Sequence, residues 1–391
     1  MYVARQMESK IQELVKIFPA IAVLGPRQSG KTTLVKKQFP NYKYFNLEEL
    51  DLREFAKSDP RRFLDLACSG NGVILDEIQY APELLSYIQS RIDQNRIPGF
   101  FILTGSQNIL ISQYVNQSLA GRISILTLLP LSIGELRNSS HPVSTLDQTM
   151  YEGFYPLVSA NGINSQDWYD NYIRTYVERD IRQIKNITNL SLFQKFIKLC
   201  AGRIGQVLNL SSLANDCGID VNTVKSWLSV LESTYILFLL QPYHNNFNKR
   251  LIKMPKLFFY DVGLACRLLE IQSSAQLNYH HLRGGLFESM IIADLIKQRL
   301  NQGRTANLYF WRDQTGNEID CILDYGETLK PIEIKSSQTL SSDYFDMLLK
   351  WQKISGALDS SSYVVYGGDV SMSKKGGVAI GWKDVAALNQ T

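Results

Sequence analysis

A glycine-rich segment near the start of the chain has the sequence Gly25-Pro26-Arg27-Gln28-Ser29-Gly30-Lys31-Thr32. It fits the pattern of a glycine, four residues and then Gly-Lys-Ser/Thr that is typical of phosphate-binding loops. An apolar run at residues 20–24 predicts a buried strand before the segment, and residues 33–37 predict a helix after it. Because the motif needs this strand and helix around it, the sequence predicts a site for a nucleoside triphosphate.

The residue types of this segment, which we call the phosphate loop, suit a triphosphate and a metal ion. Its glycines let the backbone curl so that successive N–H groups point at phosphate oxygens, and the following helix adds its positive end. Lys31 is predicted to contact the β- and γ-phosphates in catalysis, and the Thr32 hydroxyl to coordinate Mg²⁺. We therefore expect ATP and Mg²⁺ as cofactors. The residues predicted to bind nucleotide here are Gly25, Arg27, Gln28, Ser29, Gly30, Lys31, Thr32 and Thr33.

A second apolar run, at residues 72–75, ends in two carboxylates, Asp76 and Glu77. We predict that Asp76 helps to hold Mg²⁺ through a bound water, and that Glu77 polarises the water that attacks the γ-phosphate. The structural alternative is a cap for a helix that begins at Ile78, since aspartate is a good cap. One strand-like run, at residues 43–47, separates the pair from the phosphate loop, and this order favours the catalytic interpretation.

A third apolar run, at residues 99–106, ends in a turn rich in hydroxyl groups. In P-loop ATPases with an additional strand between the two nucleotide motifs, a polar residue at this place senses the γ-phosphate. Ser106, Thr104 and Gln107 are the candidates, and we predict that Ser106 contacts the nucleotide. The alternative is a turn that uses glycine and serine only for their backbone freedom.

Arg122 precedes a further strand-like run at residues 123–129. It is a candidate for contact with the transition state, either in its own chain or on a neighbouring subunit of a homo-oligomer. A solvated arginine at a strand end is the competing explanation. With a predicted helix at residues 59–68, the alternation of strands and helices predicts a parallel, doubly wound α/β sheet whose carboxyl edge holds the nucleotide site.

Four segments of this first part occur in a characteristic order. They are Gly-Pro-Arg-Gln-Ser-Gly-Lys-Thr-Thr at 25–33, Val-Ile-Leu-Asp-Glu-Ile-Gln at 73–79, Leu-Thr-Gly-Ser at 103–106 and Leu-Ala-Gly-Arg at 119–122. In this order they resemble a family of prokaryotic AAA-like ATPases in which a C-terminal domain of unknown function follows the ATPase domain. Later segments, at 176–181, 259–264 and 285–288, match this family too. The resemblance covers essentially the whole chain and implies this architecture.

The middle of the chain has the element order of a winged-helix domain. Residues 211–219 predict a short helix and a glycine turn, and a second helix follows. Strand-like runs come next at residues 235–240 and 257–260, with a polar connection between them. Basic residues of this connection and its flank are candidate contacts to DNA phosphates, and they are Lys249, Arg250, Lys253 and Lys256. The alternative is a module that only packs between two larger domains.

Acidic residues of the last part fall on predicted neighbours in a sheet. Residues 286–300 predict a helix with Glu288 in its first turn. Three strands are predicted to follow, at residues 308–311, 318–323 and 331–335. Because successive strand residues point to opposite faces, Glu333 and Lys335 share one face. Asp320 lies on the adjacent strand of a predicted hairpin.

A helix with a glutamate, then an aspartate, then Glu-x-Lys on a three-stranded sheet is similar to the PD-(D/E)xK nuclease fold. The similarity implies that Asp320 and Glu333 are catalytic metal ligands and that Lys335 is the catalytic lysine. It also implies that Glu288 is an auxiliary metal ligand. Ile319 stands where the motif name has a proline, at a position that varies in this fold. The alternative is a solvated strand face where acidic and basic side chains pair across the hairpin.

Length and composition limit the classes of protein to consider. A chain of 391 residues suggests several domains, which we predict at 1–145, 146–275 and 276–391. Its five cysteines form no Cys-x-x-Cys pair, so neither a disulfide framework nor a zinc site is expected. No apolar run approaches the ~20 residues that span a bilayer, so we expect no membrane partner and a reducing, cytoplasmic setting. The net charge of +4 permits a DNA partner without demanding one.

Two functional hypotheses follow from these patterns. The first is a DNA-associated, ATP-dependent enzyme in which the first domain hydrolyses ATP, the second docks to DNA and the third contacts or cleaves phosphodiesters. The second is an ATP-switched binding protein whose nuclease-like domain binds a partner without cleavage. Both need Lys31 and Asp76, whereas only the first needs Asp320, Glu333 and Lys335.

Overall fold

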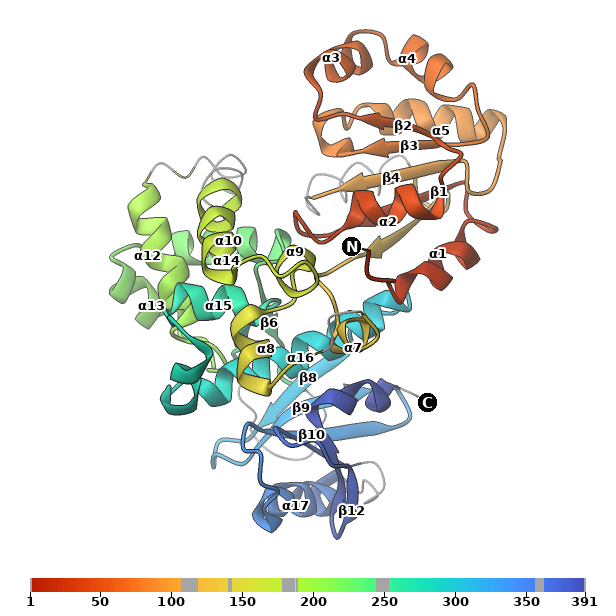
Figure 1. The fold of residues 1–391 in the computed structure, drawn as a ribbon. Helices are drawn as coiled ribbons and strands as arrows, with labels where there is room; N and C mark the ends of the chain where they lie inside the picture. The colour runs from red at the N-terminus through yellow and green to blue at the C-terminus, as the bar shows by residue number, and fades with distance from the viewer. Residues whose placement is uncertain are drawn as a thin grey trace.

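The computed structural model describes residues 2–106, 119–139, 143–177, 187, 189–243, 253–355 and 362–389. Three parts of the chain surround one long helix, α16 (Arg283–Asn301), with the first part at the top of Figure 1 and the last at the bottom. The candidate sensor Gln107 and the hairpin residues Lys249 and Arg250 lie outside the described residues, as does the segment 178–181 of the family resemblance.

The first part of the chain is a parallel sheet with helices on both faces, as predicted. Its strands lie in the order β2-β3-β4-β1-β5, and every neighbouring pair is parallel. The strands are β1 (Ala20–Leu24), β2 (Lys43–Asn46), β3 (Val73–Asp76), β4 (Phe101–Gly105) and β5 (Ile123–Thr127). β1 and β4 are buried along their whole length because helices cover both faces, which explains their uninterrupted apolar sequences.

The helices of this part divide between the two faces of the sheet. On one face the core contains side chains of α1 (Met7–Leu14) and α2 (Lys31–Gln38). On the other face it contains side chains of α3 (Leu50–Ser58), α4 (Pro60–Ala67) and α5 (Leu84–Gln94). The phosphate loop lies between β1 and α2 at the carboxyl edge of the sheet.

The middle part is mostly helical and contains the predicted pair of helices. Asp220 caps the second of them by accepting hydrogen bonds from the N–H groups of Asn222 and Thr223, each at 2.9 Å. The helices of this part are α8 (Leu146–Glu152), α9 (Pro156–Ser159), α10 (Ser165–Tyr172), α12 (Leu190–Ala201), α13 (Leu210–Cys217), α14 (Val221–Ser233) and α15 (Val262–Leu268), and α7 (Ile133–Arg137) precedes them at the end of the first part. Assignment of this region as a winged helix stays a prediction.

The two strands predicted after α14 form an antiparallel hairpin, β6 (Leu237–Leu240) and β7 (Lys256–Phe259). This hairpin does not stand apart, because the chain beyond β6 continues beside the sheet of the last part. The N–H of Phe310 donates to the carbonyl of Gln241 at 3.1 Å, and the N–H of Tyr243 donates to the carbonyl of Phe310 at 2.7 Å. Backbone hydrogen bonds therefore attach the hairpin to the C-terminal sheet.

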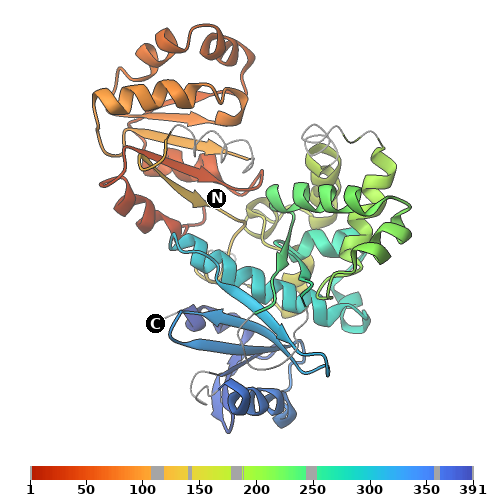
Figure 2. The ribbon, with the colours of Figure 1, turned by 180° about the vertical axis from the view of Figure 1, so that it is seen from behind.

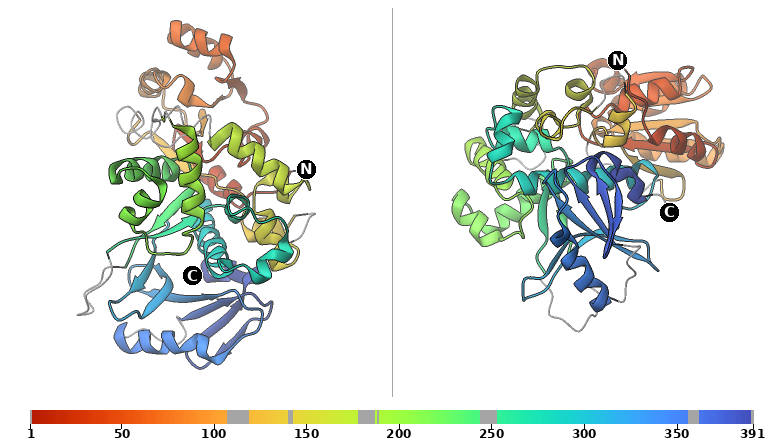
Figure 3. Two further views of the ribbon diagram at one scale, coloured as in Figure 1. Left: turned by 90° about the vertical axis from the view of Figure 1, so that its left-hand side faces the viewer. Right: turned by 60° about the horizontal axis from the view of Figure 1, so that its bottom comes forward.

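The last part contains a mixed sheet of six strands in the order β12-β13-β11-β10-β9-β8. The strands are β8 (Leu308–Arg312), β9 (Glu318–Asp324), β10 (Leu329–Lys335), β11 (Tyr363–Tyr366), β12 (Met372–Lys374) and β13 (Gly377–Gly381). The first three form the predicted antiparallel meander, and β11 then pairs parallel to β10. The helix α17 (Asp346–Ser355) packs on one face and α16 on the other (Figure 3).

One apolar core runs from the middle part into the last part without interruption. It includes Leu228 and Phe258 from the middle, Met290 from α16, and Ile332 and Val365 from the C-terminal sheet. The same helix also contacts β5 and α1 of the first part. Figure 2 shows α16 from behind, in cyan between the sheet of the first part and that of the last. The helix is thus packed against all three predicted domains.

Candidate nucleotide site and candidate acidic site

The phosphate loop has the backbone conformation that its glycines make accessible. Gly25 has a φ of 150°, and a Cβ atom there would stand 2.1 Å from the carbonyl oxygen of Leu128. Gly30 has a φ of 95° and immediately precedes α2. Side chains are strained at such values, so the backbone itself requires both motif glycines.

Lys31 is buried and folds back over the loop. Its Nζ donates hydrogen bonds to the carbonyl oxygens of Gly25, at 3.0 Å, and Pro26, at 2.8 Å. Burial lowers the pKa of Lys31, while Glu77 and Asp76 act in the opposite direction. An ammonium group held at a turn of this kind is placed to meet phosphate oxygens.

Asp76 is the centre of a hydrogen-bond cluster at the carboxyl end of β3. The Thr32 hydroxyl lies 3.0 and 2.9 Å from its two oxygens, and the Tyr44 hydroxyl donates to it at 2.7 Å. The Thr104 hydroxyl donates to the same carboxylate. The capping alternative does not occur, because the short helix that follows is preceded by Glu77 and has no side-chain cap. A hydroxyl and a carboxylate are thus held together as Mg²⁺ would require.

Glu77 follows in the left-handed region, with a φ of 57°. Its N–H donates to Thr104 Oγ1 at 3.1 Å, which fixes the turn. Gln79 donates through Nε2 to the Glu77 carboxylate and to Ser106 Oγ, the latter at 3.0 Å. The predicted catalytic carboxylate and the candidate sensor are therefore joined through Gln79. Its place in the Asp-Glu-Ile-Gln sequence was the only signal that could have indicated this role.

A cavity of about 340 Å³ opens over the phosphate loop. Its walls come from the loop and α2, from Glu77, from the N-terminal segment and from the middle part of the chain. The lining includes Tyr2, Val3, Arg5, Arg27, Gln28, Lys31, Thr32, Thr33, Glu77 and Leu157. Cavities of this size hold small ligands. Loop amides, one ammonium group and a hydroxyl–carboxylate pair fit a nucleotide with Mg²⁺.

Arg122 lies away from this cavity, which corrects its expected contact with the nucleotide of its own chain. It precedes β5 at the amino edge of the parallel sheet, whereas the phosphate loop lies at the carboxyl edge. Its carbonyl accepts from the N–H of Ala20, where β1 begins. Its guanidinium pairs with Asp93 at 2.6 and 3.0 Å. Contact with a neighbouring subunit stays a prediction.

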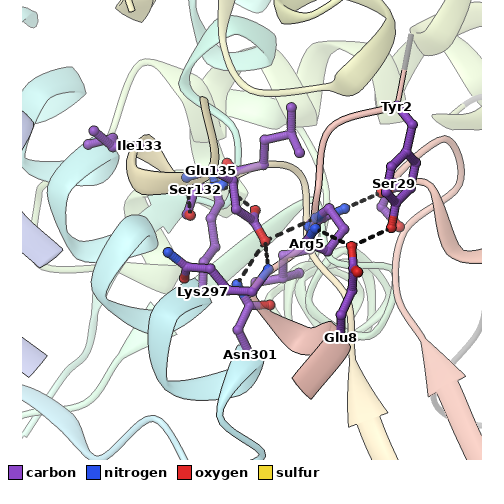
Figure 4. Close-up of polar contacts among 12 residues, drawn as sticks. Tyr2, Arg5, Glu8, Ser29, Ser132, Ile133, Glu135, Lys297 and Asn301 are labelled. Atoms are coloured by element: carbon purple, nitrogen blue, oxygen red, sulfur yellow. Dashed lines mark hydrogen bonds and ion pairs between the residues drawn. The ribbon is translucent and has the colours of Figure 1, made fainter. Parts of the chain in front are cut away.

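Arg5 joins the phosphate loop to the rest of the molecule, although no sequence motif pointed to it (Figure 4). Its guanidinium donates to the carbonyls of Ser29, at 2.8 Å, and Leu129, at 2.7 Å, and to Glu135 at 3.1 Å. Glu135 also accepts a hydrogen bond from Asn301 at 3.3 Å. Because Asn301 ends α16, a buried series of polar contacts connects the loop with this helix.

In the last part of the chain, three of the predicted site residues meet. Lys335 Nζ lies 3.1 Å from Asp320 Oδ2 and 2.7 Å from Glu333 Oε2. Glu333 and Lys335 therefore share one face of β10, as predicted. The N–H of Ile334 donates to Asp320 at 2.8 Å. A β-bulge accompanies this contact, since Asp320 and Cys321 of β9 together oppose a single residue of β8.

Glu288 contacts a different lysine, which comes from the middle part of the chain. Lys256 Nζ lies 2.8 Å from Glu288 Oε1 and also pairs with Glu318. The Lys256 side chain is only 3% exposed, so its predicted contact with DNA phosphates is wrong for this structure. Glu318 was not predicted, although its place two residues before Asp320 on the same strand was a usable signal. We call Glu288, Glu318, Asp320 and Glu333 the acidic cluster.

Burial controls the charges of this cluster. Burial raises the pKa of Glu288 to about 8, although Lys256 acts to lower it, and burial together with Asp320 raises the pKa of Glu333 to about 8. Burial disfavours the charged lysines too, yet the neighbouring carboxylates raise the pKa of both Lys256 and Lys335 above the ordinary value. The charges of these carboxylates and of the two lysines therefore depend on one another.

The carboxylates suit a divalent cation by chemical type, since Mg²⁺ prefers oxygen ligands. Glu333 Oε1 is buried and has no hydrogen-bond partner among the described residues. The same residues contain no group of three or more His, Cys, Asp or Glu side chains arranged to hold a metal ion. The second observation agrees with a cluster whose oxygens are engaged mainly by lysines, and Oε1 of Glu333 is an exception.

Comparison with known domains defines the class of the first part. Residues 18–137 match the AAA domain profile, and with the parallel sheet and the phosphate loop this makes the first part an AAA-like P-loop ATPase domain that binds ATP. Residues 143–275 and 283–385 match two domains of unknown function, DUF8612 and DUF4143. No helix in the described ranges combines the length and apolar character needed to cross a membrane.

Relatives with similar sequences span most of this chain. An uncharacterized protein of Mycobacterium tuberculosis is 27% identical over 344 residues, which cover 86% of this chain and 75% of the relative. An uncharacterized protein of Methanocaldococcus jannaschii is 22% identical over 344 residues, covering 80% and 73%. Among solved structures, a Walker-type ATPase of Pyrococcus abyssi is 15% identical with a TM-score of 0.44, covering 67% of this chain and 94% of its own.

Proposed function

We propose that the protein hydrolyses ATP at the phosphate loop in a Mg²⁺-dependent reaction. Lys31 contacts the β- and γ-phosphates, while Thr32 and Asp76 hold the metal. Glu77 polarises the attacking water, and Ser106 senses the γ-phosphate through Gln79. The observation that carries the proposal is the Thr32–Asp76 hydrogen bond at 2.9 Å beside a cavity that Glu77 also lines. Bound Mg²⁺ supplies charge neutralisation at the phosphates.

ATP binding and ATP hydrolysis measured side by side test these roles. We expect Glu77→Gln to bind ATP and to lose hydrolysis, because the amide cannot accept the proton of the water. The control is Glu83→Gln, which changes an exposed carboxylate beyond the turn. Hydrolysis by Glu77→Gln at the wild-type rate would contradict the role of Glu77.

We propose further that the acidic cluster acts on phosphodiesters of DNA. Asp320 and Glu333 would hold a divalent cation, and Lys335 would orient water or the phosphate. The proposal is supported by the contacts of Lys335 with both carboxylates and by the unpartnered Oε1 of Glu333. Docking of DNA would use basic residues of the hairpin connection, Lys249, Arg250 and Lys253.

Cleavage of labelled single- and double-stranded DNA, with Mg²⁺ or Mn²⁺ and with or without ATP, tests the second proposal. We expect Glu333→Ala to abolish cleavage and Lys31→Ala to abolish its dependence on ATP. Glu327→Gln, at an exposed position in the β9–β10 turn, is the matched control. Docking is tested by the triple alanine variant of the three basic residues, which should lower DNA affinity and the slope of its salt dependence.

A nucleotide-switched binding protein is the second candidate function, and the contacts of Arg5 favour it. Besides the Glu135–Asn301 contact, Asp294 of α16 accepts from the N–H of Ile133 at 2.6 Å, and Lys297 donates to the carbonyl of Leu131 at 3.1 Å. The segment that leaves the ATPase sheet is thus held along α16. ATP-dependent hydrogen exchange in α16, without DNA cleavage under any condition, would establish this function in place of the nuclease.

A further inference from the structure

Lys256 belongs to the middle part of the chain by sequence and to the acidic cluster by position. It is the first residue of β7, and its ammonium group lies between Glu288 and Glu318. Its side chain is 3% exposed, whereas that of Lys335 is 33% exposed. Lys335 can therefore meet a bound phosphate, and Lys256 cannot do so where it stands.

The backbone around Lys256 holds it in this place. The N–H of Leu257 donates to the carbonyl of Gln206 at 3.1 Å, and the N–H of Gly205 donates to the carbonyl of Leu257 at 2.8 Å. Gly205 in turn lies against Glu288, whose Oε2 would stand 3.2 Å from a Cβ atom at that glycine. Lys256 thus reaches the cluster only while this loop and the hairpin stay docked.

A divalent cation and this ammonium group compete for the same oxygens. Glu288 has Oε1 engaged by Lys256, and two positive charges a few ångströms apart in a buried site repel strongly. A lysine paired with buried carboxylates is stable only while those partners remain, because a buried charge without a partner is costly. Glu333, with a 6% exposed side chain and an unpartnered Oε1 among the described residues, marks the side of the cluster that can still accept a cation.

We propose that Lys256 is a tethered cation that closes the acidic cluster by occupying Glu288 in place of a divalent metal ion. The inference rests on the proposed metal-binding function of the cluster.

Mn²⁺ binding by the full-length, nucleotide-free protein tests this inference, measured by calorimetry and by electron paramagnetic resonance. We expect Lys256→Met to bind Mn²⁺ at least about tenfold more tightly than the wild type, because the competing charge is gone. We also expect Mn²⁺ to raise the melting temperature of this variant more than that of the wild type. Lys374→Met, an exposed lysine of β12 in the same C-terminal sheet, should bind Mn²⁺ as the wild type does.

The outcomes separate this inference from the proposed function. If Glu333→Gln loses Mn²⁺ binding while Lys256→Met binds as the wild type does, the metal site stands and the closing role of Lys256 is overturned. If Glu333→Gln also binds as the wild type does, the metal site itself is wrong. Should Lys256→Met not fold, Glu318→Gln removes one carboxylate that holds the lysine, and an unchanged Mn²⁺ affinity in that variant overturns the inference.

Discussion

The phosphate loop and the acidic cluster both place lysines beside carboxylates, yet they are built in opposite ways. The loop comes from one short segment, and Lys31 donates to carbonyls five and six residues away in the chain. The acidic cluster takes its side chains from α16, β9 and β10, and its second lysine from β7. The phosphate loop depends on the backbone conformation of one segment, whereas the acidic cluster depends on contacts between side chains of distant elements.

This difference determines what each site must rearrange when a ligand binds. The phosphate loop faces a cavity, and its lysine needs only to turn from backbone carbonyls toward a ligand. In the acidic cluster each lysine already has two carboxylate partners, so a metal ion at Glu288 must first break the buried ion pair with Lys256. The phosphate loop is thus a preformed site and the acidic cluster a closed one, so we expect substitutions in the two sites to affect ligand binding differently.

The largest expected effect is on the phosphate loop. Lys31→Ala should lower the rate of ATP hydrolysis by about 10³-fold, as expected when a charged donor to the reacting phosphates is removed. The measurement is phosphate release at saturating ATP. Lys16→Ala, at an exposed position after α1, is the control. A rate of hydrolysis within a few-fold of the wild type would contradict the proposed role of Lys31 at the phosphates.

The next effect tests the connection between the phosphate loop and α16. Arg5→Ala removes one partner of a buried pair with Glu135, and the free energy of unfolding should fall by about 3–5 kcal/mol. Urea unfolding measures this change. Arg137→Ala breaks an exposed pair with Asp384 and should have little effect. Equal stability of both variants would show that the contacts of Arg5 do not hold the first part to α16.

A smaller effect should appear where the middle part packs on the start of α16. A Cβ atom at Gly285 would stand 2.6 Å from the carbonyl of Ile204, whereas one at Gly284 meets nothing within 4 Å. Gly285→Ala should therefore destabilise the protein by about 1–3 kcal/mol, as overpacking does. Gly284→Ala, its neighbour in the same helical turn, should be neutral. Thermal unfolding of the two variants separates close packing from helix propensity.

The smallest effect is expected at Arg122. Because its guanidinium pairs with Asp93 at the amino edge of the sheet, Arg122→Ala should leave ATP hydrolysis unchanged in dilute protein. Hydrolysis measured over a wide range of protein concentration checks this. A defect that appears only at high concentration would instead support contact between neighbouring subunits.

Much of the fold could be predicted because its signals are local. The phosphate loop, the strands before and after it, and the Glu-x-Lys strand follow from short-range patterns of apolar residues, glycines and strand alternation. Beyond the predicted meander, β11 and β13 are apolar runs, but the order of the six-stranded sheet was not predictable. Strand order depends on contacts between segments far apart in sequence, which no local pattern records.

Positions of single charged residues could also be predicted where local patterns determine them, and not where distant segments do. Sequence was sufficient for Thr32 beside Asp76 and for Lys335 beside Glu333, because motif geometry or strand periodicity brings each pair together. It was insufficient for Arg122, Lys256 and Arg5. The sequence predicted that Arg122 contacts the nucleotide and that Lys256 contacts DNA phosphates, whereas Arg5 belongs to no motif.

Local backbone preference and side-chain periodicity act over a few residues, so the amino-acid sequence alone determined the phosphate loop and predicted a nucleotide as its ligand. The docking of the β6–β7 hairpin and the burial of α16 were settled only when the whole chain packed, because burial and ion pairing depend on which distant surfaces meet. For that reason Lys256, an exposed cation by its sequence, lies buried among carboxylates in the folded protein.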